Sequence, residues 1–124
     1  MLFRSQESCY LRVNTKMTWS DAQKTCEKNN ANLVTVNSDG EMRFIGRIMK
    51  DNGGWNGLHL DEDDDTLVWS SGEKSDYQNW GKRGSKRQSE LQNCVHMSEK
   101  TNGLKWTMAR CSIKYKFTCE KGKN

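Results

Sequence analysis

Apolar residues in the first part of the chain recur at the spacing of an α-helix. Trp19, Ala22 and Cys26 stand at positions i, i+3 and i+7, which share one face of a helix. Thr18 directly precedes them and belongs to the residue types whose side-chain oxygen accepts a hydrogen bond from the first helical turn. The two asparagines at 29–30 follow the last apolar position. The pattern therefore predicts a helix that begins after Thr18 and ends near 29–30.

A second apolar stripe at helical spacing comprises Phe44, Ile45, Ile48 and Met49. Ser38 stands before the stripe and Glu41 follows it three residues later, which is the sequence signature of a capping box. The Asp-Asn-Gly-Gly run at 51–54 is typical of a helix stop. We therefore predict a second helix between Ser38 and 51–54.

Outside these helices the apolar residues form short runs that are typical of β-strands. The candidates are 33–36, 55–60, 67–69, 93–97, 104–108 and 115–119. The segment 70–93 is rich in Gly, Ser, Lys and Arg, and a loop of that length is usually functional or mobile. The pattern predicts an α+β protein.

Length and charge narrow the possible functions. The chain has 124 residues, which fits one domain over 1–124. No apolar run approaches the roughly 20 residues of a transmembrane helix, and residues 1–13 lack the apolar core of a signal peptide. We therefore expect no direct membrane insertion. The net charge of +4 is mild and no recognition motif is present, so we expect no nucleic-acid partner.

The five cysteines are Cys9, Cys26, Cys94, Cys111 and Cys119. In a short chain this number is typical of disulfide-stabilised proteins from an oxidising compartment, which predicts a secreted protein or the extracellular part of a membrane protein. No Cys-x-x-Cys pair supports a zinc or thioredoxin-type redox site. Four cysteines can pair in three ways and their spacing does not choose among them, while an odd count leaves one thiol over.

Several motifs, in this order, resemble those of a C-type lectin-like domain. They are Trp19-Ser20-Asp21-Ala22 with Cys26, Asn32-Leu33-Val34-Thr35-Val36, Trp55-Asn56-Gly57-Leu58, Trp69-Ser70-Ser71-Gly72, Tyr77-Gln78-Asn79-Trp80, Asn93-Cys94-Val95, Trp106 before Cys111, and Phe117-Thr118-Cys119-Glu120. Each motif alone is weak, but the ordered set is specific and covers a core of about 8–121. The resemblance implies two helices flanking a small antiparallel sheet, with a long loop region that carries the ligand surface.

The resemblance also implies a disulfide pairing, Cys26 with Cys119 and Cys94 with Cys111. Cys9 looks like the second cysteine of the N-terminal hairpin in longer family members, whose partner would lie upstream of Met1. Cys9 would then belong to a truncated longer protein, form an intermolecular disulfide in a linked dimer, or remain an inert thiol.

Family members that bind sugar through calcium use a Glu-Pro-Asn or Gln-Pro-Asp segment after the loop Trp and a Trp-Asn-Asp segment before the third core cysteine. In this chain the ligand positions fall on Gly84, Lys86, Gln92, Thr107 and Met108. Calcium takes about six to eight oxygen ligands, yet every charged ligand is missing and Lys86 adds a cation. We therefore expect a calcium-independent member with no metal and no cofactor.

The five consecutive acids at 61–65 have three interpretations. They could form a solvated loop or a weak cation site, although the residues at positions six and twelve do not fit an EF-hand. The third interpretation is an internal ion pair, because the resemblance places Arg87 where one calcium ligand would stand. A guanidinium can bind a carboxylate through two hydrogen bonds, so this hypothesis pairs Arg87 with Asp61 or Asp64.

The basic segment 82–87 is either a mobile, soluble loop or a binding edge for anions or proteins. The ligand-binding candidates in and around it are Lys82, Arg83, Lys86, Arg87, Gln92, Asn93 and Thr107. The five tryptophans are expected in the core. Neither His59 nor His96 has a nucleophile pattern or a metal-spaced partner, so catalysis is not expected.

The predicted function is extracellular recognition of a protein ligand without calcium. The alternatives are carbohydrate binding by a non-standard route, such as sulfated glycans on the basic loop, and a secreted effector or toxin-like subunit.

Overall fold

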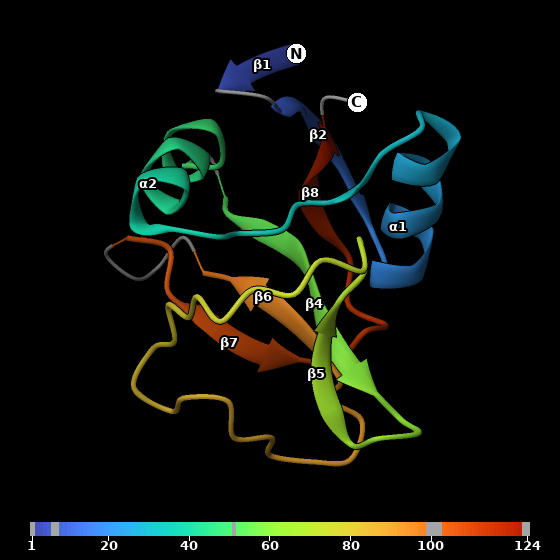
Figure 1. Cartoon of the computed structure of the whole chain (residues 1–124). Coiled ribbons are helices and arrows are strands. Elements are labelled where there is room, and N and C mark those ends of the chain that lie inside the picture. The colour runs from blue at the N-terminus through green and yellow to red at the C-terminus, as the bar shows by residue number, and fades with distance from the viewer. Residues whose placement is uncertain (1, 6–7, 51, 99–102, 123–124) are drawn as a thin grey trace.

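The computed structural model describes residues 2–5, 8–50, 52–98 and 103–122. Its elements, in chain order, are β1 (Leu2–Ser5), β2 (Ser8–Met17), α1 (Trp19–Lys28), β3 (Asn32–Leu33), α2 (Asp39–Ile48), β4 (Gly54–Asp61), β5 (Thr66–Trp69), β6 (Cys94–Met97), β7 (Trp106–Ala109) and β8 (Tyr115–Gly122). Figure 1 shows α1 and α2 on either side of the upper part of the sheet, with the loop between β5 and β6 running below it.

Both predicted helices are confirmed, and their N-caps act as expected. The Thr18 side chain accepts a hydrogen bond from the Asp21 N–H (3.3 Å), and the Ser38 side chain accepts one from the Glu41 N–H (3.1 Å). The first N–H groups of a helix have no carbonyl partner within the helix, and these side chains accept hydrogen bonds from two of them. The apolar stripe of each helix faces the protein interior.

The sheet has eight strands and mixed pairing. Its main order is β1-β2-β8-β4-β6-β7, with β3 added to β8 and β5 added to β4. The predicted antiparallel arrangement holds for every pair except β4 and β8, which meet in parallel where Trp55 lies opposite Phe117. That contact joins the helix-flanked strands to the strands that carry the long loop.

Strands β1 and β2 were not among the predicted elements. β2 pairs with β8 from Ser8 opposite Gly122 to Met17 opposite Tyr115, so it is a central strand rather than an edge. One face of β2 places Tyr10 and Arg12 in the interior. The buried arginine breaks the apolar alternation from which a strand is usually predicted, which is why the pattern missed it.

The predicted strand 33–36 is shorter than expected, because β3 contains only Asn32 and Leu33. The following residues, 34–36, are buried, and Val34 is hydrogen-bonded to two strands. The Val34 N–H donates to the Thr118 carbonyl (3.1 Å), and the Gly57 N–H donates to the Val34 carbonyl (2.9 Å). The segment therefore bridges β8 and β4 without forming a regular ladder.

Two disulfides connect these elements with the pairing that the family resemblance implied. Cys26–Cys119 links α1 to β8, and Cys94–Cys111 links β6 to the segment before β8. Trp55 and Phe117 are fully buried beside them. Within the described residues, neither helix is both long and apolar enough to cross a membrane.

Candidate functional site

The segment around Trp80 is attached to β7 by backbone pairing. The Trp106 N–H donates to the Asn79 carbonyl (2.9 Å), and the Gly81 N–H donates to the Trp106 carbonyl (3.0 Å). The Asn79 carboxamide also donates to the Gly103 carbonyl (3.1 Å) and accepts from Lys105 Nζ (3.0 Å). This part of the long loop is therefore an extension of the sheet and has a defined position.

Trp106 lies at the centre of an aromatic cluster beneath this segment. Its ring meets Trp69 and Trp80 at 5.6 Å and Tyr77 at 5.9 Å, each edge to face. Such arrangements are favourable because the positive ring edge meets the negative ring face. The Tyr77 hydroxyl donates to Asp39 (2.8 Å), and burial together with this bond raises the pKa of Tyr77 to about 12. The cluster thus fixes the loop against α2.

The expectation that the tryptophans belong to the core holds fully for Trp55, Trp69 and Trp106, which are at most 5% exposed. It needs correction for two tryptophans that are only half-buried, Trp19 on α1 and, in the long loop, Trp80. Its outer edge lies in a hollow of about 780 Å³. The reason is its position outside the regular strands, where a single bridge joins Trp80 to Trp106 of β7 and the two rings meet edge to face.

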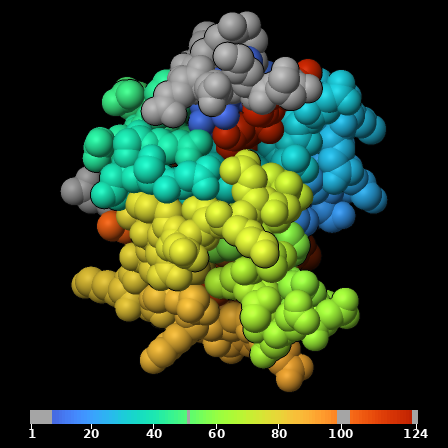
Figure 2. Space-filling view, in the orientation of Figure 1, coloured from blue at the N-terminus to red at the C-terminus, as the bar shows by residue number. Residues whose placement is uncertain are grey.

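The hollow beside Trp80, called here the Trp80 hollow, is lined by Trp80, Gly81, Lys82, Arg83, Ser98, Lys105, Trp106 and Thr107. The structure therefore gathers three predicted ligand-binding candidates, Lys82, Arg83 and Thr107. It adds Lys105, which sequence reasoning missed because nothing local connects β7 with the loop. Figure 2 shows the long loop, yellow to orange, as a continuous surface across the lower half of one face.

The other candidates do not line the Trp80 hollow. Arg87 donates to the Asn93 side chain and to the Glu90 carbonyl (3.5 Å), and Gln92 accepts from the backbone N–H of Gln88. These bonds close the loop on itself. Lys86 is exposed, and Asn93 lines a second hollow, of about 410 Å³, beside the start of α1.

The hypothesis that Arg87 pairs with Asp61 or Asp64 is not supported by the contacts of these described residues. Arg87 is engaged by Asn93 and Glu90, which are near in sequence and easier to reach. The acidic loop at 61–65 also forms hydrogen bonds within itself. The Asp65 N–H donates to the Asp61 carbonyl (2.8 Å), and the Asp63 N–H donates to the Asp61 carboxylate (3.0 Å). It forms an exposed turn between β4 and β5.

Among the described residues, no three His, Cys, Asp or Glu side chains are placed to hold a metal ion. At the positions equivalent to the sugar-site ligands, Met108 is buried and Thr107 lines the Trp80 hollow. Calcium independence stays a prediction.

Two further expectations concern single side chains. Cys9 is a free, half-buried cysteine on β2, where its backbone lies between those of Arg4 and Lys121. Its three interpretations, a truncated longer protein, an intermolecular disulfide and an inert thiol, stay predictions. The histidines lie on strands, as expected. His59 packs against Trp19 at 4.5 Å, and His96 stacks on Tyr115 at 3.8 Å.

Comparison with known proteins identifies the class of this fold. Residues 15–121 match the family described as the lectin C-type domain, so the chain belongs to that family. Mouse (Mus musculus) lithostathine-1 is 32% identical over an alignment of 118 positions, and the match covers 90% of this chain and 71% of that protein. Snaclec A8 of Macrovipera lebetinus is 31% identical over an alignment of 124 positions, and the match covers 90% of this chain and 90% of that protein. The structure of human lithostathine superposes with a TM-score of 0.88 at 29% identity, covering 98% of this chain and 97% of that one.

Proposed function

We propose that this chain is an extracellular recognition domain that binds a protein ligand without calcium, and that the Trp80 hollow is its contact surface. The observation that carries the proposal is a half-buried tryptophan beside two exposed cations, Lys82 and Arg83, on a backbone segment anchored to β7. An ordered surface loses little conformational freedom on binding, which favours affinity.

The chemistry of the Trp80 hollow suits a protein partner with an apolar side chain flanked by carboxylates. Tryptophan and arginine are the residues most enriched among those that dominate binding energy in protein interfaces. Lys82 and Arg83 add positive charge at the rim, which would steer an acidic partner toward the hollow and orient it there. The floor is apolar, because Trp106 lies beneath Trp80.

Calcium independence is supported by the charge of one side chain and the chemistry of another. Lys86 stands where the family's sugar-site motif carries an acid or its amide, and a cation there opposes calcium. Met108 is buried in the core, and its thioether is not the oxygen ligand that calcium requires. The extracellular location is supported by the two disulfides, which persist in oxidising compartments.

The test is a binding screen against a panel of purified receptor ectodomains and plasma proteins. It is run once with millimolar calcium and once with chelator. We expect equal binding in both conditions, a loss of at least tenfold in affinity for Trp80→Ala, and a smaller loss for Lys82→Glu with Arg83→Glu. Lys24→Glu, an exposed lysine on α1, is the matched control. Binding that requires calcium, or that survives all changes at the Trp80 hollow, would contradict the proposal.

A second candidate is the binding of sulfated glycans at the same rim, favoured by the placement of Lys82 and Arg83 beside a half-buried aromatic ring. A glycan array probed with calcium and with chelator separates the two. Hits restricted to sulfated sugars, lost at high salt and in Lys82→Glu with Arg83→Glu, would favour the glycan.

A further inference from the structure

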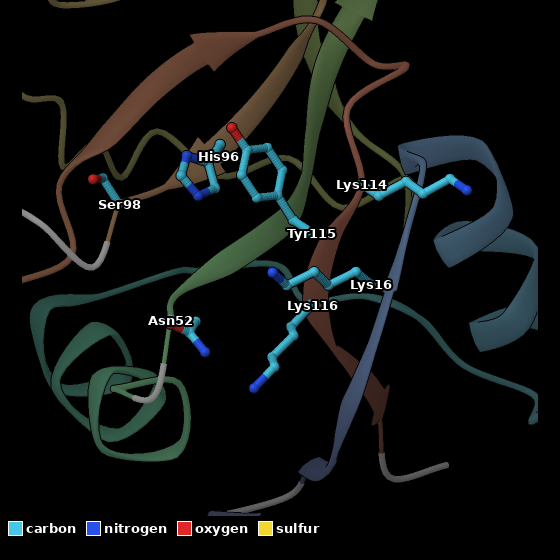
Figure 3. A pocket seen from close by; sticks show the side chains of 7 residues that line it. All are labelled: Lys16, Asn52, His96, Ser98, Lys114, Tyr115 and Lys116. Atoms are coloured by element: carbon cyan, nitrogen blue, oxygen red, sulfur yellow. The ribbon is translucent and has the colours of Figure 1, made fainter.

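A different hollow lies where the start of β8 meets the end of β2 and β6. It measures about 330 Å³, which is at the lower end of the roughly 300–1,000 Å³ range of ligand pockets. Its described lining residues are Lys16, Asn52, His96, Ser98, Lys114, Tyr115 and Lys116 (Figure 3). We call it the lysine hollow. It shares only Ser98 with the Trp80 hollow.

The pairing of β2 with β8 brings the lysines together. Met17 lies opposite Tyr115, and the register between these strands shifts between Val13 and Met17. An irregularity of this kind bends a strand and redirects its side chains. It places Lys16 next to the strand that carries Lys116, and in Figure 3 their amino groups lie below the ring of Tyr115.

Two stacked rings form the wall above these lysines. The rings of His96 and Tyr115 are parallel to within 10° at a centroid distance of 3.8 Å. Behind them, buried Trp55 meets Tyr115 edge to face at 4.8 Å, and the Trp55 indole N–H donates to the Met17 carbonyl (2.9 Å). The wall is therefore rigid, and it is attached to the same strand end that carries Lys16.

The charge of the lysine hollow comes from its lysines. Lys16 is exposed and Lys116 is half-buried, while the amino group of Lys114, which is exposed, points away from these two (Figure 3). No described lining residue is acidic. Burial lowers the pKa of His96 to about 4, so the imidazole is neutral at physiological pH. Asn52 adds a carboxamide at the rim. The backbone of Asn52 itself has a positive φ of 106°.

We propose that the lysine hollow binds a sulfate or phosphate monoester. The ammonium groups of Lys16 and Lys116 hold the oxyanion, and the organic group that carries it lies against Tyr115 and His96. Lysines bind such oxyanions as point charges without a fixed geometry, which suits a shallow site. A flat ring wall beside the cations favours an ester over the free ion, because only the ester has a carbon skeleton to cover the rings.

The experiment follows the His96 and Tyr115 signals of the whole chain by NMR during titration with four probes. The probes are inorganic sulfate, inorganic phosphate, a sulfated heparin tetrasaccharide and the same tetrasaccharide after desulfation. We expect the sulfated tetrasaccharide to shift both signals and to raise the pKa of His96, because a nearby anion favours the imidazolium. Weaker shifts of the same signals with the inorganic ions would show the oxyanion subsite alone.

A double variant, Lys16→Gln with Lys116→Gln, tests the role of charge. A close charge pair in a water-like medium is equivalent to about a fivefold change in affinity, so the variant should bind about 25-fold more weakly. Lys24→Gln removes the same kind of charge from α1 and should change affinity less than twofold. Thermal unfolding of each variant checks that the fold is intact.

The outcomes separate this site from the Trp80 hollow. Loss of binding in Lys82→Gln with Arg83→Gln, with no effect of the double variant, would overturn the proposal and point to the long loop. Equal binding of the desulfated sugar, or no shift of His96 with any probe, would also overturn it. Inorganic ions that bind as tightly as the tetrasaccharide would support the oxyanion subsite and overturn the contribution of the aromatic wall.

Discussion

Glu120 on β8 should make this protein less stable as the pH rises toward neutrality. Its carboxylate accepts hydrogen bonds from the Ser8 hydroxyl (2.8 Å) and from the Thr35 N–H (3.1 Å). Burial nevertheless raises its pKa to about 7 and outweighs the opposing effect of the Ser8 bond, while the nearby charge of Glu41 raises it further. Glu41 itself accepts a hydrogen bond from the Tyr10 hydroxyl (2.6 Å).

The direction of this pH dependence follows from the pKa of Glu120 in the folded and in the unfolded protein. The folded protein binds the Glu120 proton more tightly than the unfolded chain, whose carboxyl has a pKa of 4.5. The contribution to stability is therefore complete below pH 4.5 and is lost as the pH rises through about 7. Each pKa unit corresponds to about 1.4 kcal/mol, so the loss amounts to about 3 kcal/mol as an upper figure.

Glu120→Gln tests this directly, because glutamine keeps the shape and is neutral at every pH. Its oxygen can accept from the Thr35 N–H and its amino group can donate to the Ser8 hydroxyl. We expect the variant to exceed the wild type in unfolding free energy by about 1–3 kcal/mol at pH 8, with the difference vanishing near pH 4.

The assay is urea unfolding of both proteins at steps between pH 4 and pH 8. Burial lowers the pKa of His96 to about 4, so this histidine gives an opposite trend between about pH 4 and pH 6.5 in both proteins. Because both proteins contain His96, its contribution cancels in the difference between their unfolding free energies. Glu62→Gln, in the exposed acidic turn, controls for net charge. Parallel stability curves, or a variant that is less stable at pH 8, would refute the reasoning.

Three further predictions concern the framework. Gly57→Ala should lower the unfolding free energy by about 2 kcal/mol or more in denaturant titration, because a Cβ there would lie 2.9 Å from the Leu33 carbonyl oxygen and 2.7 Å from the Ser70 hydroxyl; an unchanged midpoint would contradict this. Replacing Cys94 and Cys111 together by alanine should cost about 3 kcal/mol for a span of 17 residues, and a loss under about 1 kcal/mol would argue against it. The imidazole of His96 should titrate near pH 4 by NMR, whereas a midpoint near 6.5 would show that it is not buried.

The helices are the part of the fold that sequence determines most completely. Their caps, Thr18 and Ser38, and their apolar stripes act over a few residues of the same segment, so local chemistry suffices to place them. The disulfide pairing was not accessible in this way. Spacing left three pairings open, and only the ordered motifs of the family chose the one that the structure contains.

The central position of β2 was decided by tertiary contacts. Its hydrogen-bond partners lie on β8, about a hundred residues later in the chain, and its interior face includes the polar side chain of Arg12. The same is true of Trp80, whose tryptophan identity predicts burial although β7 covers only part of the ring. Residue type alone does not determine how far the rest of the chain buries a side chain.

The two hollows show this division most clearly. The basic loop was visible in the sequence, but Lys105 joins it only because β7 pairs with the segment after Asn79. Lys16 and Lys116 had no signal at all, since they stand about a hundred residues apart and share a site only through strand pairing. Sequence determines the segments whose stability is local. The sites depend on which distant segments pack together, and that is set by the burial and hydrogen bonding of the whole chain.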